Sequence, residues 1–233
     1  MRIYNTLVRK IEEFKPINPP KVGMYTCGPT VYDFMHIGNL RTFVFADILR
    51  RVLLENGFEV TAVQNITDID DKIIKMAKEK GISIKDLADE YTKYFLEDIN
   101  KLNIMPSNVQ PKATEHVGKM IKYIEKLLEN GLAYLEKDGS VYFDISKFSS
   151  YGKLSQIEKR ELKTGMRILS DEYTKDNVQD FALWKAVEGS PSTHSTYAQG
   201  RTEWNRSTTS SGFTSWDSPW GWGRPGWHIE CSV

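Results

Sequence analysis

The chain has 233 residues, of which 40% are hydrophobic and 27% charged, values typical of a soluble globular protein with one large or two small domains. Basic and acidic residues number 31 each, so the net charge is zero and gives no general attraction to nucleic acid. The first sixteen residues alternate apolar and charged side chains, which excludes a secretory signal or a membrane-spanning segment there. We therefore expect a cytoplasmic location and no membrane partner.

Three consecutive segments near the N-terminus predict a βαβ unit. Residues 22–27 form a short apolar run that ends at Gly28-Pro29, as a buried strand that leads into a turn would. Apolar residues then recur at helical spacing from residue 38 until Asn56-Gly57 supplies a stop. Residues 58–64 are typical of a second strand. Because such units have parallel strands, we predict an α/β, Rossmann-like half-fold with its chemistry at the end of the first strand.

The middle of the chain is predicted to be largely helical. Amphipathic spacing indicates helices over residues 70–80, 84–102 and 113–130. An Asp-Gly turn at 137–139 predicts a hairpin of residues 133–136 and 140–143. Residues 148–174 are polar and rich in lysine, so we expect a loosely structured excursion from the main sheet, after which residues 181–184 return to a buried segment.

A Ser/Thr-rich stretch at residues 192–214 differs in kind from the sequence around it. It shows no periodicity and few apolar residues, a composition that does not offset the entropy of ordering a chain. We expect an exposed loop insertion that limited proteolysis cuts first. An error in the gene sequence is the alternative interpretation.

The segment after the first predicted strand carries a candidate nucleotide site. His36 stands just before a predicted helix, where backbone N–H groups and the helix dipole favour phosphate. Gly38 would let a ligand approach the backbone closely. The residues alone leave a second interpretation open, because a histidine at such a position can equally be a helix cap or a packed side chain.

The run from Cys27 to Asn39, CGPTVYDFMHIGN, gives this segment a more specific meaning. Residues 36–39, His-Ile-Gly-Asn, resemble the "HIGH" signature of class I aminoacyl-tRNA synthetases, and the whole run resembles the cysteine-specific family. The resemblance implies ATP binding by His36 and Gly38. Asn39 replaces the usual fourth histidine and would donate to a phosphate or ribose oxygen. Further matches in the family's order occur at residues 65–72, 111–116, 151–155, 180–185 and 226–232.

This resemblance implies a class I synthetase catalytic domain with a connective insertion, truncated at its C-terminus. Residues 1–112 would form the first half of the Rossmann-like domain, and 113–189 a connective segment that returns to it. Residues 190–217 would be the Ser/Thr-rich insertion, and 218–233 the start of the second half. The implied reaction joins cysteine to ATP as cysteinyl-adenylate and transfers the cysteinyl group to tRNA(Cys).

The chain has two cysteines, Cys27 and Cys231. A lone pair in a reducing compartment indicates a metal-binding, catalytic or structural role more than a disulfide. The resemblance implies zinc bound by both cysteines, because a soft metal distinguishes a thiolate from the hydroxyl of serine. Two further family ligands, a histidine and a glutamate, and the "KMSKS" loop would lie beyond Val233. We therefore expect converging thiols, weak zinc binding and slow adenylate formation by this chain alone. A less favoured alternative is that His228 replaces one of these two zinc ligands.

Two more residues match the family's pocket for the substrate cysteine, Thr67 and Trp227. Alternatives remain for both: Thr67 and the adjacent Asp68 suit a helix cap before Asp70, and Trp227 suits the core. Basic residues could meet tRNA phosphates or form a solvated face, namely Lys119, Lys122, Lys126, Lys153, Lys159, Arg160, Lys163 and Arg167.

The expected ligands and partners are ATP with magnesium, cysteine, zinc and tRNA(Cys), and a monomer is the working expectation. Two rival functions remain. One is the cysteine ligase of mycothiol synthesis, which passes the same adenylate to an amino sugar. The other is a non-catalytic zinc- or nucleotide-binding relative of such enzymes. Cysteine-dependent exchange of pyrophosphate into ATP would mark an enzyme, and binding without exchange would mark the non-catalytic relative.

Overall fold

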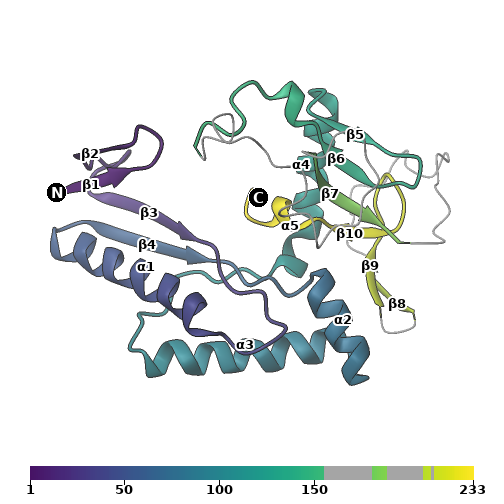
Figure 1. The fold of residues 1–233 in the computed structure, drawn as a ribbon, viewed down its shortest axis with the longest axis horizontal. Helices are drawn as coiled ribbons and strands as arrows, with labels where there is room; N and C mark the ends of the chain where they lie inside the picture. Colours follow the sequence, from purple (N-terminus) through teal and green to yellow (C-terminus); the bar gives the residue numbers. More distant parts are fainter. Residues whose placement is uncertain (155–179, 188–206, 211–212) are drawn as a thin grey trace.

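A computed structural model describes residues 1–154, 180–187, 207–210 and 213–233. Its first half contains the predicted parallel pair of strands, β3 (Lys21–Thr26) and β4 (Glu59–Gln64), joined by helix α1 (Ile37–Glu55) (Figure 1). The pairing runs from Lys21 opposite Glu59 to Thr26 opposite Gln64. The strand ends that carry the following turns therefore lie side by side, and the predicted βαβ unit is confirmed.

Helices α2 (Asp71–Lys80) and α3 (Ile84–Lys101) follow, close to the predicted bounds. Each begins at a side-chain cap: Asp70 accepts from the Lys72 amide and Ser83 from the Asp86 amide, which satisfies backbone donors that the helix leaves unpaired. The third predicted helix, 113–130, is divided into a 3₁₀ turn, η1 (Ala113–His116), and α4 (Val117–Glu129).

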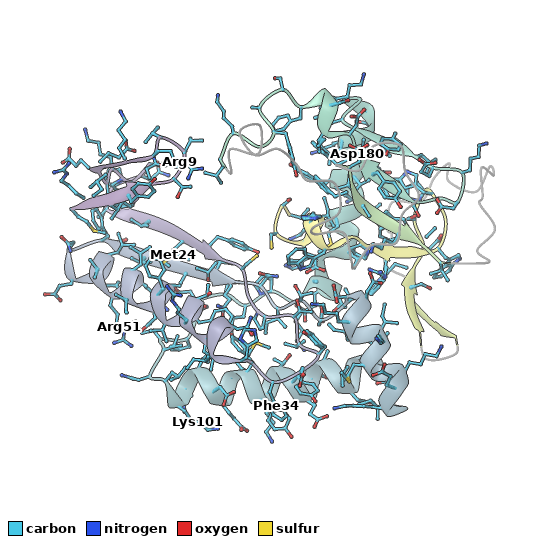
Figure 2. The ribbon with its side chains drawn as sticks, viewed as in Figure 1. Arg9, Met24, Phe34, Arg51, Lys101 and Asp180 are labelled. Carbon is cyan, nitrogen blue, oxygen red and sulfur yellow. The ribbon has the colours of Figure 1, made fainter. Side chains whose placement is uncertain are left out.

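Two hairpins flank these helices. The one that we did not predict is formed by β1 (Arg2–Asn5) and β2 (Lys10–Glu13) at the N-terminus. Figure 2 shows Arg9 on this hairpin, where its guanidinium donates to the carbonyl of Leu154 at 2.8 Å. The predicted Asp-Gly hairpin is confirmed as β5 (Ala133–Leu135) and β6 (Val141–Phe143).

A six-stranded antiparallel sheet, in the order β5-β6-β7-β10-β9-β8, occupies the other side of the molecule (Figure 1). Its later strands are β7 (Phe181–Ala186), β8 (Ser207–Ser210), β9 (Phe213–Trp216) and β10 (Gly223–Pro225). The predicted buried segment at 181–184 is confirmed as part of β7, in which Trp184 has no exposed surface.

Strands β8 and β9 correct the prediction of a loop over residues 190–217. They form an antiparallel hairpin, and Trp216 of β9 pairs with Gly223 of β10 and is buried. Threonine suits a strand, and the order comes from pairing and burial of Trp216 rather than from the average composition of the stretch. Most of the expected excursion, from residue 155 onward, and residues 190–206 and 211–212 of the predicted insertion lie outside the described residues.

One hydrophobic core joins the two sides of the molecule. It includes Val31 and Ile66, which follow the parallel strands, together with Trp184, Trp216 and Ile229 from the second sheet and helix α5 (Trp227–Glu230). In Figure 1 the C-terminus and α5 lie between the two sheets. The chain's last residues are therefore placed beside the ends of strands formed by its first residues. None of the helices in the described ranges is both long and apolar enough to span a bilayer.

Candidate functional site

The two cysteines meet where the parallel strands end. Cys27 directly follows β3 and Cys231 directly follows α5, and their Sγ atoms lie 2.9 Å apart although 204 residues separate them. Both side chains reach solvent. The expected convergence of the two sulfurs is therefore present.

The chemistry of this sulfur pair suits zinc, because thiolates are preferred ligands of that ion. Zinc sites normally use three or four protein ligands. Across residues 1–154, 180–187, 207–210 and 213–233, no group of three or more His, Cys, Asp and Glu side chains is arranged to hold a metal. Cys27 and Cys231 thus fit two of the ligand positions of a zinc site.

His228, the alternative ligand, does not join the two cysteines in a metal-binding group within the described residues. Its ring packs against that of Phe181, with centroids 4.6 Å apart, and against that of Trp227 at 5.3 Å. The imidazole therefore contributes to the aromatic packing between α5 and β7.

The surroundings of the sulfur pair disfavour a negative charge. Desolvation, followed by the hydrogen bond with Cys231 and the nearby Glu230 carboxylate, raises the pKa of Cys27. Desolvation and the two cysteines likewise raise the pKa of the Tyr25 hydroxyl. Such a place disfavours two bare thiolates and suits a bound cation, which would offset their charge.

Buried polar side chains connect the two cysteine-bearing segments. The Asn65 side-chain oxygen accepts from the Gly28 amide at 2.9 Å and from the Tyr25 hydroxyl at 2.9 Å. Its nitrogen donates to the Thr67 hydroxyl at 3.3 Å, and that hydroxyl donates to Glu230 at 2.6 Å. Burial raises the pKa of Glu230 to about 8, although the hydrogen bond from Thr67 opposes the shift.

The His36 motif forms an exposed helix start. His36 is the N-cap of α1, and its Nδ1 accepts from the Gly38 amide at 3.0 Å. The Asn39 amide donates to the His36 carbonyl at 2.9 Å. The backbone N–H groups of Gly38 and Asn39 are therefore both engaged within this first turn. The cap interpretation of His36 is confirmed, and it leaves Nε2 of the imidazole directed away from the helix backbone.

Gly38 has a steric reason to be glycine. A Cβ at this position would lie 2.7 Å from Cε1 and 2.9 Å from Nδ1 of His36, closer than carbon atoms approach without displacement. The missing side chain thus lets the imidazole fold over the first turn of α1. The structure therefore shows the His36 ring, rather than a ligand, close to the Gly38 backbone.

Thr67 and Trp227 lie in different environments. Thr67 is 2% exposed, and its hydroxyl is engaged by Asn65 and Glu230. Trp227 begins α5 and is 56% exposed, so its indole, unlike the Thr67 hydroxyl, is open to a ligand. The alternative of a core tryptophan is wrong for Trp227.

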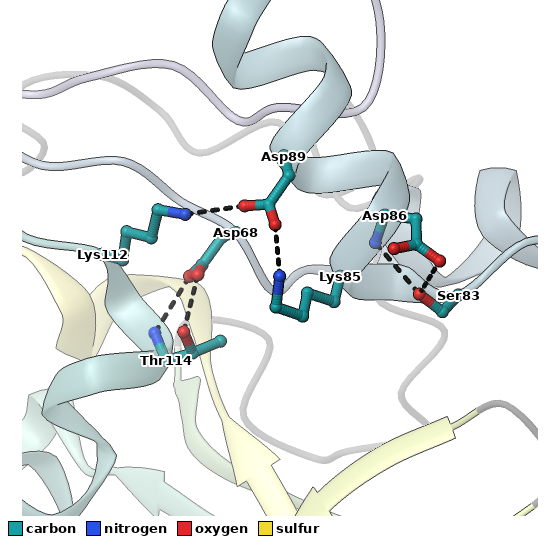
Figure 3. Close-up of polar contacts among 7 residues, drawn as sticks. All are labelled: Asp68, Ser83, Lys85, Asp86, Asp89, Lys112 and Thr114. Carbon is teal, nitrogen blue, oxygen red and sulfur yellow. Dashed lines mark hydrogen bonds and ion pairs between the residues drawn. The ribbon is translucent and has the colours of Figure 1, made fainter.

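Asp68 is directed towards η1 (Figure 3). Its carboxylate accepts from the Thr114 amide at 2.9 Å and from the Thr114 hydroxyl at 2.6 Å. Burial raises the pKa of Asp68 against the opposing effect of these two hydrogen bonds. Beside it, Asp89 of α3 bridges Lys112 at 2.8 Å and Lys85 at 2.5 Å. Asp68 therefore connects the chain after β4 to η1.

The predicted basic face of α4 is exposed at Lys119, Lys122 and Lys126, while Met120, Ile121 and Ile124 are buried. Lys153 lies at the edge of the described chain. The other four basic residues, Lys159, Arg160, Lys163 and Arg167, fall outside the described residues. A solvated helix face accounts for the three lysines on α4.

Sequence reasoning missed Asn65 and Glu230. Both lie inside segments that match the family, next to residues that were singled out, and this adjacency was the available signal. Their burial and mutual contacts depend on bringing together segments 163 residues apart, which no local pattern indicates.

Comparison with known proteins agrees with the resemblance. Residues 13–209 and 204–233 match the family described as tRNA synthetases class I (C) catalytic domain. The cysteine–tRNA ligase of Brachyspira hyodysenteriae is 50% identical over 232 residues, 99% of this chain and 44% of that protein. Those of Pyrococcus horikoshii and Chlamydia felis are 48% and 47% identical, over 100% and 99% of this chain and 44% of each protein. The chain thus spans less than half the length of these relatives.

Proposed function

The chain belongs to the family described as tRNA synthetases class I (C) catalytic domain. From this we propose that it is the cysteine-activating part of a cysteine–tRNA ligase. The proposed reaction has two steps. A carboxylate oxygen of cysteine attacks the α-phosphorus of ATP and pyrophosphate leaves. A ribose hydroxyl at the end of tRNA(Cys) then attacks the carbonyl carbon of the adenylate, and AMP leaves.

The observation that carries this proposal is the meeting of Cys27 and Cys231 at 2.9 Å, at the strand end that leads into the His36 helix start. Ligands of open α/β sheets lie at the carboxyl ends of the strands. A sulfur pair in that place fits selection of a thiol-bearing amino acid, and the adjoining helix start fits ATP.

On the ATP side, the work of this chain's residues is binding and alignment. The Gly38 amide holds Nδ1 of His36, so in neutral histidine the proton resides on Nε2, which becomes a donor towards solvent. The exposed Asn39 side chain is a second donor at the same helix start. Both donors can stabilise charge that develops on the phosphate oxygens, which Mg²⁺ would accompany.

On the cysteine side, the problem is to reject serine, which differs by a single atom. A pocket that relies on shape separates such close analogues by only ~10–200-fold. Zinc held by Cys27 and Cys231 would supply a soft Lewis acid that prefers a thiolate sulfur to a hydroxyl oxygen. The exposed Trp227 would cover one side of the bound amino acid, and Thr67 would contribute from beneath the site.

Pyrophosphate exchange into ATP tests the proposal directly. The diagnostic quantity is the ratio of the rates with cysteine and with serine, measured for the wild type and for Cys27→Ser and Cys231→Ser. We expect exchange with cysteine to exceed that with serine by more than ~200-fold, the upper range of shape selection, and both variants to lose the preference. Equal exchange with both amino acids, or zinc or ATP binding without exchange, would contradict the proposal.

The acceptor is tested by the second step. We expect transfer of labelled cysteine to tRNA(Cys), with the exposed lysines of α4 available to phosphates, and no transfer to an amino sugar. Transfer to the sugar alone would favour the mycothiol-type ligase instead. A cytoplasmic location and a monomeric state stay predictions.

A further inference from the structure

The hydrogen-bonded chain of Asn65, Thr67 and Glu230 is built as one unit. All three residues are buried, with 5%, 2% and 8% of their surfaces exposed. Polar groups removed from water destabilise a fold unless they find partners, and each of these finds a partner within the set. A buried network of this kind rigidifies the segments that it joins when every member is satisfied.

The network has a defined direction. The Asn65 oxygen is occupied by two donors from the end of β3, the Gly28 amide and the Tyr25 hydroxyl. The amide nitrogen of Asn65 must then face Thr67, whose hydroxyl accepts that bond and donates its own hydrogen to Glu230. The four hydrogen bonds therefore run in one direction, from the end of β3 to Glu230.

Each end of the network adjoins one cysteine. Gly28 follows Cys27 in the chain, and Glu230 precedes Cys231. At the Gly28 end there is no spare room, because a Cβ there would lie 1.6 Å from the Asn65 carbonyl oxygen. At the other end α5 has only four residues, and a single turn is too short to fix its own last residue. The Glu230 carboxylate ties that turn to Thr67.

We infer that Asn65, Thr67 and Glu230 are positioning residues that hold Cys27 and Cys231 close enough together to bind one thiophilic atom. The role in cysteine activation rests on the proposed function, whereas the distance between the thiols does not. Thr67 accordingly acts through Glu230 and Asn65 from beneath the site. Outer partners of this kind typically change metal affinity by about 10–100-fold.

A probe that bridges two thiols measures this positioning without ATP, tRNA or activity. Phenylarsine oxide forms two As–S bonds with a close dithiol, while its oxygen leaves as water with the two thiol protons. Its affinity for the chain is measured for the wild type, Thr67→Val, Thr67→Ser and Glu230→Leu. Cys27→Ala and Cys231→Ala show the affinity of a single thiol.

Thr92→Val is the matched control. In the part of the chain that the structure describes, the Thr92 hydroxyl is buried without a hydrogen-bond partner, so this variant reports the cost of the same exchange outside the network. Melting temperatures of all variants separate a loss of fold from a loss of positioning.

We expect Thr67→Val to weaken the arsenical by at least about 10-fold, as for other outer partners, while Thr67→Ser restores most of the affinity and Thr92→Val leaves it unchanged. If Thr67→Val does not fold, Glu230→Leu, which removes the acceptor of the Thr67 hydrogen bond, carries the test and should bind less tightly than the wild type. Unchanged affinity in folded Thr67→Val or folded Glu230→Leu would overturn the inference. Loss of pyrophosphate exchange alone would bear only on the proposed function.

Discussion

The His36 helix start and Cys27 of the sulfur pair both follow β3 in the chain, yet the two sites are assembled in opposite ways. The helix start is local: His36 caps a helix that begins one residue later, and Gly38 makes room for the ring. The sulfur pair requires Cys27 and Cys231 to be joined through a second sheet and a buried network. Substitutions far from the helix start should leave it unchanged. Substitutions at contacts between the two sides of the molecule should instead alter the distance between the two sulfurs.

Substitution of Gly28 should give the largest loss of stability. It tests whether the sulfur pair depends on contacts between distant segments. In Gly28→Ala the new Cβ meets the Asn65 backbone, which unlike a flexible side chain has little freedom to move. We expect a loss of about 3 kcal/mol of unfolding free energy, the upper end for overpacking, measured by urea denaturation. The arsenical should also bind less tightly. Stability equal to the wild type would show that the strand end adapts, and would contradict the dependence of the sulfur pair on this contact.

Asp71 tests the contact between α2 and the second sheet. It pairs with Arg224, which is buried, and with Lys185 at 2.8 Å. Removal in Asp71→Ala leaves Arg224 without this charge. We expect a loss of about 2 kcal/mol, below the usual ~3–5 kcal/mol for a fully buried pair because Asp71 is half exposed. The control on the same helix, Glu79→Ala, removes an exposed pair with Lys75 and should cost under ~1 kcal/mol.

The pH dependence of the Asp71 effect has a defined sign. Burial favours the neutral carboxyl, but Arg224 and Lys185 outweigh it and lower the pKa of Asp71. A lowered folded pKa stabilises the fold above the unfolded value of about 3.9 and loses that contribution as the pH falls through the folded pKa. The difference between wild type and Asp71→Ala should therefore shrink below about pH 4. A difference that grows on acidification would contradict this assignment.

Thr114→Val probes a contact beneath the site with an intermediate expected effect. The variant removes one of two donors to the buried Asp68 carboxylate (Figure 3), which should cost about 1–2 kcal/mol. Thr114→Ser should recover most of it. Because the folded pKa of Asp68 is already raised, its contribution destabilises the fold as the pH rises from the unfolded value of about 3.9 to the folded one. Loss of the hydroxyl donor should raise the folded pKa of Asp68 further, so the stability lost in Thr114→Val should grow as the pH rises. A loss of stability that does not change with pH would contradict this role of Thr114.

Gly38→Ala should have the smallest effect on stability, and it tests whether the helix start is independent of the sulfur pair. The imidazole must leave the cap, which costs about 1 kcal/mol, while alanine improves helix propensity by a similar amount. We expect unfolding free energy within ~0.5 kcal/mol of the wild type, unchanged arsenical affinity, and ATP affinity reduced by about 10-fold or more because the donor at Nε2 is misplaced. Reduced arsenical affinity would show that the two sites are coupled.

The same contrast explains what could be predicted from sequence. The β3–α1–β4 unit and the Asp-Gly hairpin follow from spacing and turn residues over short distances, and both were predicted close to their bounds. The His36 cap was anticipated as one of two interpretations. The Cys27–Cys231 pairing came from the family resemblance rather than from the pattern of residues.

The rest depended on distant partners. Strands β8 and β9 were predicted as loop because their Ser/Thr-rich composition gives little sign of order, whereas pairing with β10 and burial of Trp216 supply it. Asn65 and Glu230 are ordinary polar residues until the fold buries them together. Contacts of this kind arise from tertiary packing, and no periodicity marks them.

X-ray absorption of the zinc-loaded chain tests the central claim, that Cys27 and Cys231 form one metal site, most directly. We predict two sulfur ligands per zinc in the wild type, one in Cys27→Ser and one in Cys231→Ser, and one additional sulfur when free cysteine is supplied. Zinc bound with nitrogen and oxygen ligands alone, or a sulfur count that neither substitution changes, would contradict the account.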